Sequence, residues 1–253
     1  ITTHLKLLEL SNMNHPVLKD LIFKAPGTYQ HSIIVGNLAE SGALKIGANS
    51  LLARVASYYH DIGKGEDAVY FVENQAPNMP NIHNNLAPLD SAQKIIGHLR
   101  DGAKIAEKHR LGSAIKNIML QHHGTNRGTY FYKKAVKNID ESQGEPPVDE
   151  NLFRYPGPKP QNLEAAVVMM ADIAEAATRS IDNPSVESIT EMVDKVCWSI
   201  LRDGQLDESG ITLQTYHEVV QVYSSMLISI HHPRIKYPED SLVSTTDFRG
   251  PNR

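Results

Sequence analysis

The sequence NLEAAVVMMADIAEAATRS, which runs from Asn162 to Ser180, decides the fold. As a helix it carries apolar side chains on almost every face, which is typical of a helix buried on most sides. Asn162 supplies a common N-cap residue at its start. We therefore predict a buried helix over residues 162–180, with Asp172 inside the core.

In the segments on either side of this stretch, the apolar residues recur at the spacing of a helix rather than that of a strand. The two clearest helices are predicted over residues 28–46, opened by a Thr28 cap, and from Asn49 to His60. Further helices are predicted over residues 14–24, 88–99, 113–123, 184–201 and 212–230. The predicted fold class is therefore all-α, a compact multi-helix bundle in one domain.

Two long loops interrupt these helices, over residues 74–87 and 139–160, and the second carries five prolines. Loops of this length in a compact helical domain tend to be functional or mobile.

The composition predicts a soluble globular protein, because 253 residues at 41% hydrophobic can bury a core. The net charge of -4 supplies no positive field, so we expect no DNA or RNA polymer as a partner. The single cysteine, Cys197, excludes an intramolecular disulfide and fits a reducing compartment, so we expect a cytoplasmic location. The chain begins at Ile1 without a signal peptide or an 18-residue apolar run, which is typical of a fragment with no membrane span.

Histidine is the unusual residue, with 12 copies. His31, His60 and His122 each lie at helical spacing from apolar residues, so three helices each aim an imidazole at the core. One such histidine is more often a hydrogen-bonded core residue than a ligand. Three on separate helices, each near another potential ligand, favour a shared metal centre. Those neighbouring residues are Asp61, His98 and His123.

Asp172 adds a carboxylate to this buried set. An unpaired charge in a core is costly, so Asp172 needs a cation, several donors or a metal ion. Arg179, further along the same helix, could form an internal salt bridge with it. Taken alone, the salt bridge and the metal are equally supported, whereas the buried histidines favour the metal.

The string YYHDIGK, from Tyr58 to Lys64, resembles the His-Asp doublet of the HD metallohydrolase superfamily, an all-α family that mostly cleaves phosphate esters. The order of the candidate residues is more specific, because it resembles the complete ligand set of the two-metal version. That order is His31, His60, Asp61, His98, His122, His123 and Asp172.

Flanking strings narrow the resemblance to the cytoplasmic HD domain of the seven-transmembrane-HD, or PgpH-type, family of bacterial cyclic di-AMP phosphodiesterases. These strings are APGTYQHS (25–32), YFVENQ (70–75), QHHGT (121–125), ADIAEAATRS (171–180), DGQLDE (203–208) and HPRIKYPE (232–239). The related cyclic di-GMP hydrolases carry Gly-Tyr-Pro after the paired ligands, whereas this chain reads HHGTNRGTYFY from His122 to Tyr132. That difference argues against the cyclic di-GMP subgroup.

The resemblance implies two transition-metal ions per chain, with Asp61 bridging them. One ion would be held by His31, His60, Asp61 and Asp172, and the other by Asp61, His98, His122 and His123. Imidazoles with carboxylates suit transition metals better than Mg²⁺ or Ca²⁺. Fe or Mn is preferred because six-coordinate ions leave positions open, and a hydroxide bridging the ions would attack the phosphate.

The predicted catalytic residues are Lys64 and Asp61. Lys64 lies just past the turn at Gly63 and could stabilise the charge that grows on phosphoryl oxygens. Outside the HD context it would be taken for an ordinary solvated lysine. The residues predicted to bind substrate are Lys64, Asn74, Thr125 and Arg179.

The function implied by the resemblance is hydrolysis of cyclic di-AMP to linear pApA. The alternatives are a mixed-valent di-iron HD oxygenase, which needs O₂, and a non-catalytic cyclic-dinucleotide sensing module, against which the complete ligand set argues. We expect an HD phosphodiesterase domain over residues 1–240 and a polar tail over 241–253. The family resemblance also implies a place at the cytoplasmic face of the cell membrane, through a transmembrane portion absent from this chain; oligomerisation is left open.

Overall fold

The computed structural model describes residues 3–76, 80–139 and 146–231. Within them all the regular secondary structure is helical apart from one isolated bridge between Arg127 and Arg154, so the all-α prediction is confirmed. The α-helices are α1 (His4–Leu10), α2 (Pro16–Lys24), α3 (Pro26–Lys45), α4 (Ser50–Tyr59), α5 (Pro88–Lys108), α6 (Ser113–Gln121), α7 (Thr129–Lys137), α8 (Leu163–Arg179), α9 (Val186–Arg202) and α10 (Leu213–His231). Short 3-10 helices are η1 (Ile62–Glu66), η2 (Ala68–Tyr70), η3 (Val72–Asn74), η4 (Ile82–Asn85) and η6 (Glu150–Phe153).

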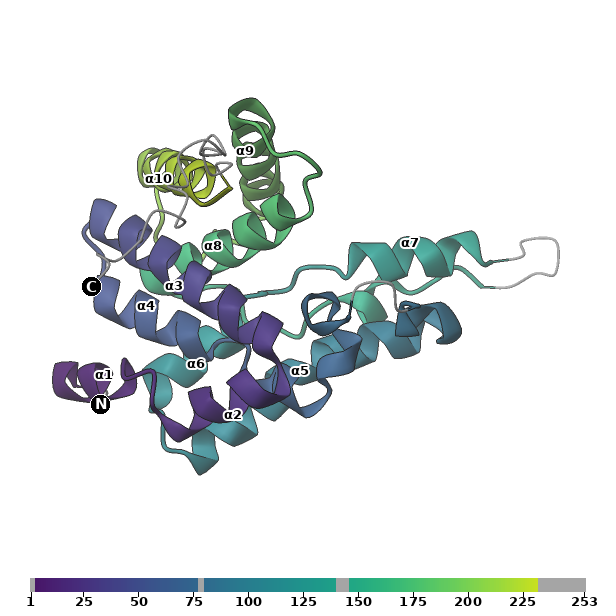
Figure 1. Ribbon diagram of the computed structural model, residues 1–253. Helices are drawn as coiled ribbons and strands as arrows, with labels where there is room; N and C mark the ends of the chain where they lie inside the picture. Colours follow the sequence, from purple (N-terminus) through teal and green to yellow (C-terminus); the bar gives the residue numbers. More distant parts are fainter. Residues whose placement is uncertain (1–2, 77–79, 140–145, 232–253) are drawn as a thin grey trace, which may run out of the picture.

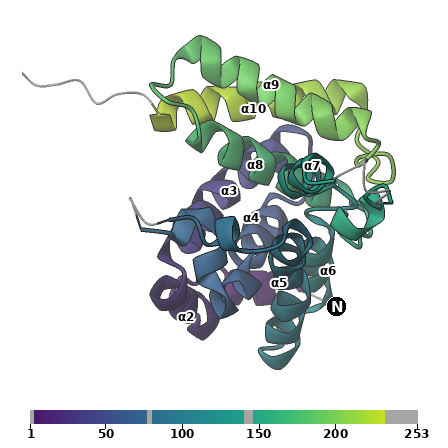
Figure 2. The same cartoon turned by 90° about the vertical axis from the view of Figure 1, so that its right-hand side faces the viewer.

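The helices form layers around α8 (Figure 1). α3 packs against both α4 and α8, and α9 and α10 pack against each other over α8. Figure 2 shows α9 and α10 side by side along one edge of the molecule, with α4, α5 and α6 on the other side of α8. α7 extends away from this bundle, as Figure 1 shows.

The predicted central helix is buried as expected. All residues from Ala165 to Asp172 are buried in α8, and their apolar members form the middle of the larger core. A second core lies among α1, α2, α4 and α6. The polar candidate residues come from elements that border these two apolar clusters, so they are shielded from water on several sides.

The start of α3 corrects the predicted cap. The helix begins at Pro26, because proline suits the first helical position, and Thr28 lies buried within the first turn. The cap comes instead from Asn74, whose Oδ1 accepts hydrogen bonds from the backbone N–H groups of Gly27 and Thr28 at 3.0 and 3.2 Å. Sequence spacing missed this cap because a residue distant in the chain supplies it.

Three further helices differ from the prediction in where they end. α5 continues to Lys108, well past the predicted end at Leu99. α4 and α6 each end one residue before a candidate ligand, so His60 and His122 are C-cap residues. Both residues keep right-handed helical backbone angles, so their side chains continue the helical pattern. The helical spacing therefore predicted correctly that both side chains point into the core.

Gly63, where the sequence suggested a backbone bend, is needed for a close contact. A Cβ atom there would lie 2.0 Å from the carbonyl oxygen of His98 and 2.5 Å from the backbone nitrogen of Gly102. Glycine therefore lets η1, which follows Asp61, lie directly on α5.

The predicted boundary between a domain over residues 1–240 and a tail over 241–253 lies outside the described residues. Among the helices that the structure describes, none combines the length and the apolar character needed to cross a bilayer.

Candidate metal centre

The structure brings all seven predicted ligands together. They come from α3 (His31), the end of α4 (His60 and Asp61), α5 (His98), the end of α6 (His122 and His123) and α8 (Asp172). Six of the seven are buried, and only the side chain of His123 is partly exposed, at 20%. Five separate segments therefore deliver nitrogen and oxygen atoms to one space that is largely shielded from solvent.

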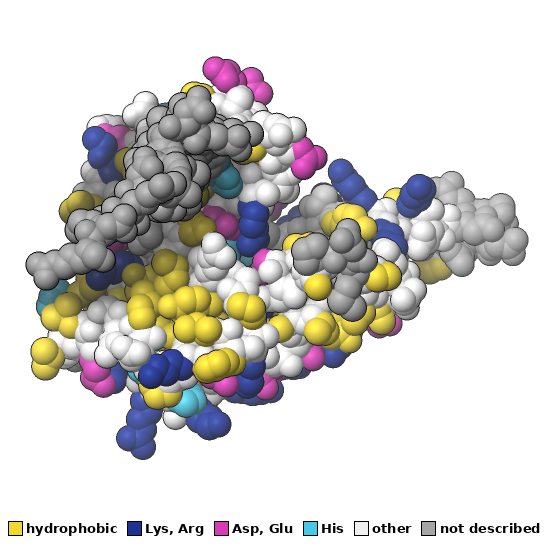
Figure 3. Space-filling view, viewed as in Figure 1, with side chains coloured by type: hydrophobic (Ala, Val, Ile, Leu, Met, Phe, Trp, Pro, Cys, Tyr) yellow, Lys and Arg dark blue, Asp and Glu magenta, His cyan; other side chains and the backbone are white. Residues whose placement is uncertain are grey.

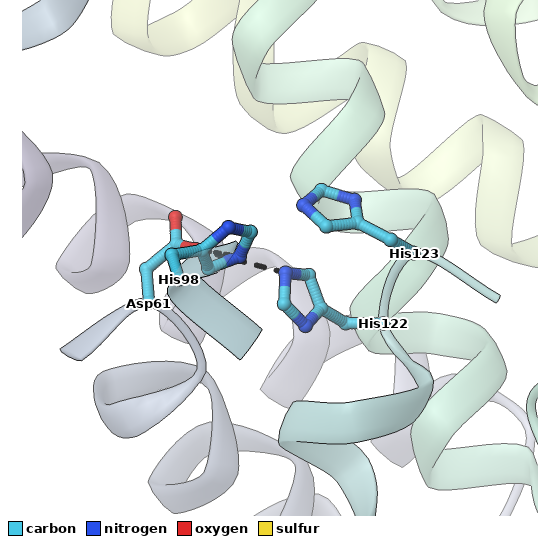
Figure 4. Close-up of side chains that lie close together, drawn as sticks. All are labelled: Asp61, His98, His122 and His123. Carbon is cyan, nitrogen blue, oxygen red and sulfur yellow. Dashed lines mark ion pairs between the residues drawn. The ribbon is translucent and has the colours of Figure 1, made fainter. Parts of the chain in front are cut away.

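Asp61 lies between two sets of imidazoles. Its Oδ2 atom is 3.1 Å from Nε2 of His60 and 3.6 Å from Nε2 of His31. Its Oδ1 atom is 3.2 Å from Nε2 of His98 and 3.6 Å from Nε2 of His122. Figure 4 shows Asp61, His98, His122 and His123 gathered in this way. Each carboxylate oxygen thus faces a different pair of histidines, which is the arrangement that a bridging carboxylate requires.

Asp172 faces histidines rather than arginine. Its Oδ1 is 3.1 Å from Nε2 of His31 and 3.8 Å from Nε2 of His60, while its Oδ2 is 3.6 Å from Nδ1 of His123. The alternative salt bridge with Arg179 is wrong, because that guanidinium lies 3.7 Å from Glu175 instead.

Two groups of potential ligands share Asp61. We call His31, His60, Asp61 and Asp172 the inner group and Asp61, His98, His122 and His123 the outer group. Within each group, one ligand atom per residue lies within 4.8 Å of the others. Both groups are therefore compact enough to surround an ion.

The imidazole hydrogen bonds fit metal binding. Three histidines use Nδ1 to contact a backbone carbonyl oxygen three residues earlier, each at 2.6 Å: His60 to Ser57, His98 to Ile95 and His122 to Met119. This contact makes Nδ1 the donor and leaves a lone pair on Nε2, as in many metal-binding histidines. The three Nε2 atoms and Oδ1 of Asp61 are buried without a hydrogen-bond partner among the described residues. Such atoms are costly unless a ligand satisfies them, and their chemistry suits a divalent transition metal.

The local charges keep the carboxylates ionised. Burial by itself would raise the pKa of Asp61, but His60 and Lys64 outweigh burial and hold that pKa well below its usual range. Burial likewise opposes ionisation of Asp172, but the nearby imidazoles of His31 and His60 outweigh burial and hold the pKa of Asp172 well below its usual range. Burial and the neighbouring His122 lower the pKa of His123, so its imidazole is neutral near pH 7, as a ligand must be.

Glu175 is a functional candidate that sequence reasoning missed. Its carboxylate is buried and contacts Nδ1 of His31, whereas the other three histidines described above contact backbone carbonyl oxygens. Glu175 follows Asp172 by three residues and so lies on the same side of α8. A second carboxylate at that spacing within an apolar helix was the signal that could have found it.

Lys64 lies beside the centre with its ammonium between two carboxylates. Its Nζ is 2.7 Å from Oδ2 of Asp61 and 2.9 Å from Oε1 of Glu73. Burial opposes the charge on Lys64, but the two carboxylates outweigh burial and raise its pKa, so the group is protonated. Glu73, a second missed residue, also accepts a hydrogen bond from Oγ1 of Thr28 at 3.2 Å, which ties Lys64 to the start of α3.

The other predicted substrate contacts have protein partners. Asn74 caps α3, and its amide nitrogen donates to Oγ1 of Thr28 at 2.9 Å. The hydroxyl of Thr125 accepts a hydrogen bond from Nε2 of Gln205 at 3.0 Å. Arg179 pairs with Glu175, and 38% of its side chain is exposed. Contact of these residues with substrate stays a prediction.

Tyr155, in the proline-rich loop, covers the outer group. Its ring stacks on that of His123 with centroids 4.2 Å apart and meets the ring of His98 edge-on at 6.3 Å. Burial raises the pKa of the Tyr155 hydroxyl; Lys64 opposes the rise and Asp61 adds to it, so the hydroxyl stays neutral near pH 7.

A cavity of about 460 Å³ begins at this point. It is lined by His123, Asn126, Arg127, Gly128, Thr129, Arg154, Tyr155, Ile173, Ser199, Ile200 and Asp203. In Figure 3, basic, acidic and histidine side chains are visible together in a recess of the surface. The partly exposed His123 therefore connects the buried ligand groups to a space open to solvent.

This helical fold, with a His-Asp doublet at its centre, defines a class of protein. The HD-domain family profile matches residues 28–177, and the chain belongs to the HD-domain family. Proteins of this family bind divalent metals, in agreement with the two ligand groups described here.

Within the family, the chain is similar to PgpH. It is 43% identical over 239 residues to the cyclic-di-AMP phosphodiesterase PgpH of Bacillus subtilis, covering 94% of this chain and 33% of that protein. It is 45% identical over 240 residues to the same-named protein of Listeria monocytogenes, covering 95% and 32%. The chain thus spans about a third of the length of these curated relatives.

The solved HD domain of L. monocytogenes PgpH has the same fold. Its crystal structure in complex with cyclic-di-AMP matches with a TM-score of 0.80 and 45% identity, covering 88% of this chain and all of that chain. The predicted family resemblance is therefore confirmed.

Proposed function

We propose that this domain hydrolyses cyclic di-AMP to linear pApA with a dinuclear metal centre. The observation that carries the proposal is the pair of ligand groups on either side of Asp61, each with lone pairs directed at a shared space. The similarity to PgpH, whose HD domain binds cyclic-di-AMP, supports the substrate.

The metal ions, when bound, would activate water and neutralise charge on the phosphate. The inner group would hold one ion and the outer group the other, with Asp61 in both. Fe or Mn remains our preferred metal, because imidazole and carboxylate ligands suit it and six-coordination leaves positions for substrate.

Lys64 would stabilise charge on the phosphoryl oxygens. Its ammonium is fixed by Glu73 and lies next to Asp61, so it would lie close to any ion that Asp61 holds. A preorganised cation in a site shielded from water costs little reorganisation during the reaction. Lys64 and Asp61 are thus the proposed catalytic residues.

The cavity beside His123 is the proposed route for the dinucleotide. Arg127 and Arg154 lie on its wall, and each guanidinium pairs with the carboxylate of Glu150, with N···O distances of 2.5 Å. These ion pairs fix the two guanidinium groups where they could attract an anionic ligand. We also propose that the domain works on the cytoplasmic side of a membrane as part of a longer protein. Its oligomeric state stays open.

The test is an anaerobic hydrolysis panel with metal-loaded protein. Cyclic di-AMP should be cut faster than cyclic di-GMP, and pApA should accumulate without O₂. An O₂ requirement would favour the di-iron oxygenase, and metal-loaded protein that binds cyclic di-AMP without cutting it would favour the sensing module. Equal rates on the two dinucleotides would remove the base specificity from the proposal.

A further inference from the structure

Tyr155 is the aromatic residue that lies over the outer group. Its ring contacts the rings of both His98 and His123, and its backbone is fixed by a hydrogen bond from its N–H to the carbonyl oxygen of Asn126 at 2.9 Å. The side chain also lines the cavity beside His123. Tyr155 therefore stands at the boundary between the ligand groups and the space that a substrate could enter.

Among the residues that the structure describes, the Tyr155 hydroxyl forms no hydrogen bond that stabilises the fold. Two buried core tyrosines use their hydroxyls to satisfy backbone carbonyls: Tyr59 donates to Leu10 and Tyr223 to Val167, each at 2.8 Å, whereas the buried Tyr216 hydroxyl has no partner among the described residues. Tyr155 makes no such hydrogen bond to any of the residues that the structure describes, although its ring is held on two sides. A fixed ring with an uncommitted donor is suited to a ligand.

We propose that the cavity beside His123 holds the leaving half of the dinucleotide and that Tyr155 donates its hydroxyl hydrogen to the departing 3′-oxygen. This inference rests on the proposed phosphodiesterase function. Ile173 and Ile200 give the cavity apolar surface for a nucleoside, and its volume of about 460 Å³ is within the usual range for small-molecule sites.

The chemistry requires a donor at this position. Water adds across the phosphodiester: its oxygen bonds to phosphorus, the bond between phosphorus and the 3′-oxygen breaks, and that oxygen takes up a proton. Tyr155 would pass its proton to the 3′-oxygen and regain one from solvent through the cavity. The 3′-oxygen of a ribose is a poor leaving group as an alkoxide, so a positioned donor accelerates its departure.

Lys64 is another protonated group beside the ligands, but its ammonium already pairs with two carboxylates. Its ammonium lies between Asp61 and Glu73, on the Oδ2 side of Asp61 that faces the inner group. Tyr155 lies over the outer group instead. The two side chains can therefore serve opposite sides of one phosphate, Lys64 for charge and Tyr155 for the leaving oxygen.

The experiment compares Tyr155→Phe with wild type, both metal-loaded, on two substrates. Cyclic di-AMP has an alcohol as leaving group, whereas bis(4-nitrophenyl) phosphate releases a stable phenolate that needs no proton. Tyr155→Phe keeps the ring and so should keep the metal content. We expect kcat on cyclic di-AMP to fall about 100-fold and kcat on the nitrophenyl ester to change by less than about threefold.

Tyr130→Phe is the matched control, because Tyr130 lies on α7 with 64% of its surface exposed. It should leave both rates unchanged. An equal fall on both substrates, or no fall on cyclic di-AMP, would overturn the donor role of Tyr155. If wild type cuts the nitrophenyl ester but not cyclic di-AMP, the proposed function fails; the linear dinucleotide ApA, which also has an alcohol leaving group, then decides the role of Tyr155 by the same comparison.

Discussion

The inner and outer groups share Asp61 but differ in what supports their other ligands. In the inner group, His31 contacts the buried carboxylate of Glu175, and every member is buried. In the outer group, His98 and His122 contact backbone carbonyl oxygens through Nδ1, as His60 does in the inner group, and neither has a carboxylate partner at Nδ1 among the described residues. His123 is partly exposed, and its ring lies under Tyr155 at the cavity.

This difference predicts unequal roles for the two ions. A carboxylate behind an imidazole raises its basicity and fixes its orientation, which strengthens metal binding. The inner group should therefore hold its ion more tightly, while the outer group, which reaches the cavity, should exchange its ion more readily and face the substrate. The following variants test that division, in order of their expected effect on metal binding.

Asp61→Ala should have the largest effect, the loss of both ions. Asp61 gives one oxygen to each group, so its removal leaves each group one ligand short and takes away the bridge. Elemental analysis should find almost no bound metal, and activity should disappear. Asp67→Ala, which changes an exposed aspartate paired with Lys94, is the control and should keep both ions. Retention of both metals by Asp61→Ala would show that the bridge is misassigned.

His123→Ala should empty mainly the outer group. His123 is its most exposed member and is not one of the four residues of the inner group. The variant should bind close to one ion per chain; His98→Ala should behave in the same way. Exposed His217 supplies the control, His217→Ala. Loss of both ions from His123→Ala would mean that the two groups do not fill independently.

Glu175→Gln should weaken the inner ion without removing it at saturation. Gln keeps the shape of the side chain and an oxygen for His31 but removes the negative charge. Affinity for the tighter ion should fall about 10- to 100-fold, the effect typical of such supporting residues. Competition with a chelator measures it, with exposed Glu191→Gln as the control. A selective loss of the weaker ion would reverse the comparison between the groups.

Lys64→Ala should change metal binding least. An ammonium offers no lone pair, so both ions and the fold should remain. Turnover of cyclic di-AMP should fall roughly 10²- to 10³-fold, the scale of removing one preorganised donor. Lys64→Arg should recover only part of it, and Lys94→Ala, which changes an exposed lysine, should have wild-type kinetics. If the activity of Lys64→Ala follows its metal content, the lysine is structural.

Local patterns in the sequence predicted much of this centre. Helical spacing gave the buried directions of His31, His60 and His122, because a residue's face follows from its neighbours within two turns. The apolar run of α8 likewise predicted the burial of Asp172. The grouping of these residues needed the family resemblance, because spacing within one helix carries no information about which helices meet.

The capping role of Asn74 and the positions of Glu73 and Tyr155 escaped prediction, because they depend on contacts between distant segments. Asn74 caps α3 from a position 46 residues beyond Thr28, and Glu73 reaches Lys64 from the same short helix. Tyr155 is brought over His123 by a loop whose length and prolines indicated function but not which side chain carries it. Only Glu175 left a local signal, since it follows Asp172 by three residues in an apolar helix.

The metal content of active wild-type protein tests the central claim most directly. The protein is saturated anaerobically with Fe or Mn, separated from free metal and analysed for metal and chain concentration, beside its turnover of cyclic di-AMP. Two ligand groups that share Asp61 predict close to two ions per chain at full activity. Full activity with one ion per chain would contradict the dinuclear account.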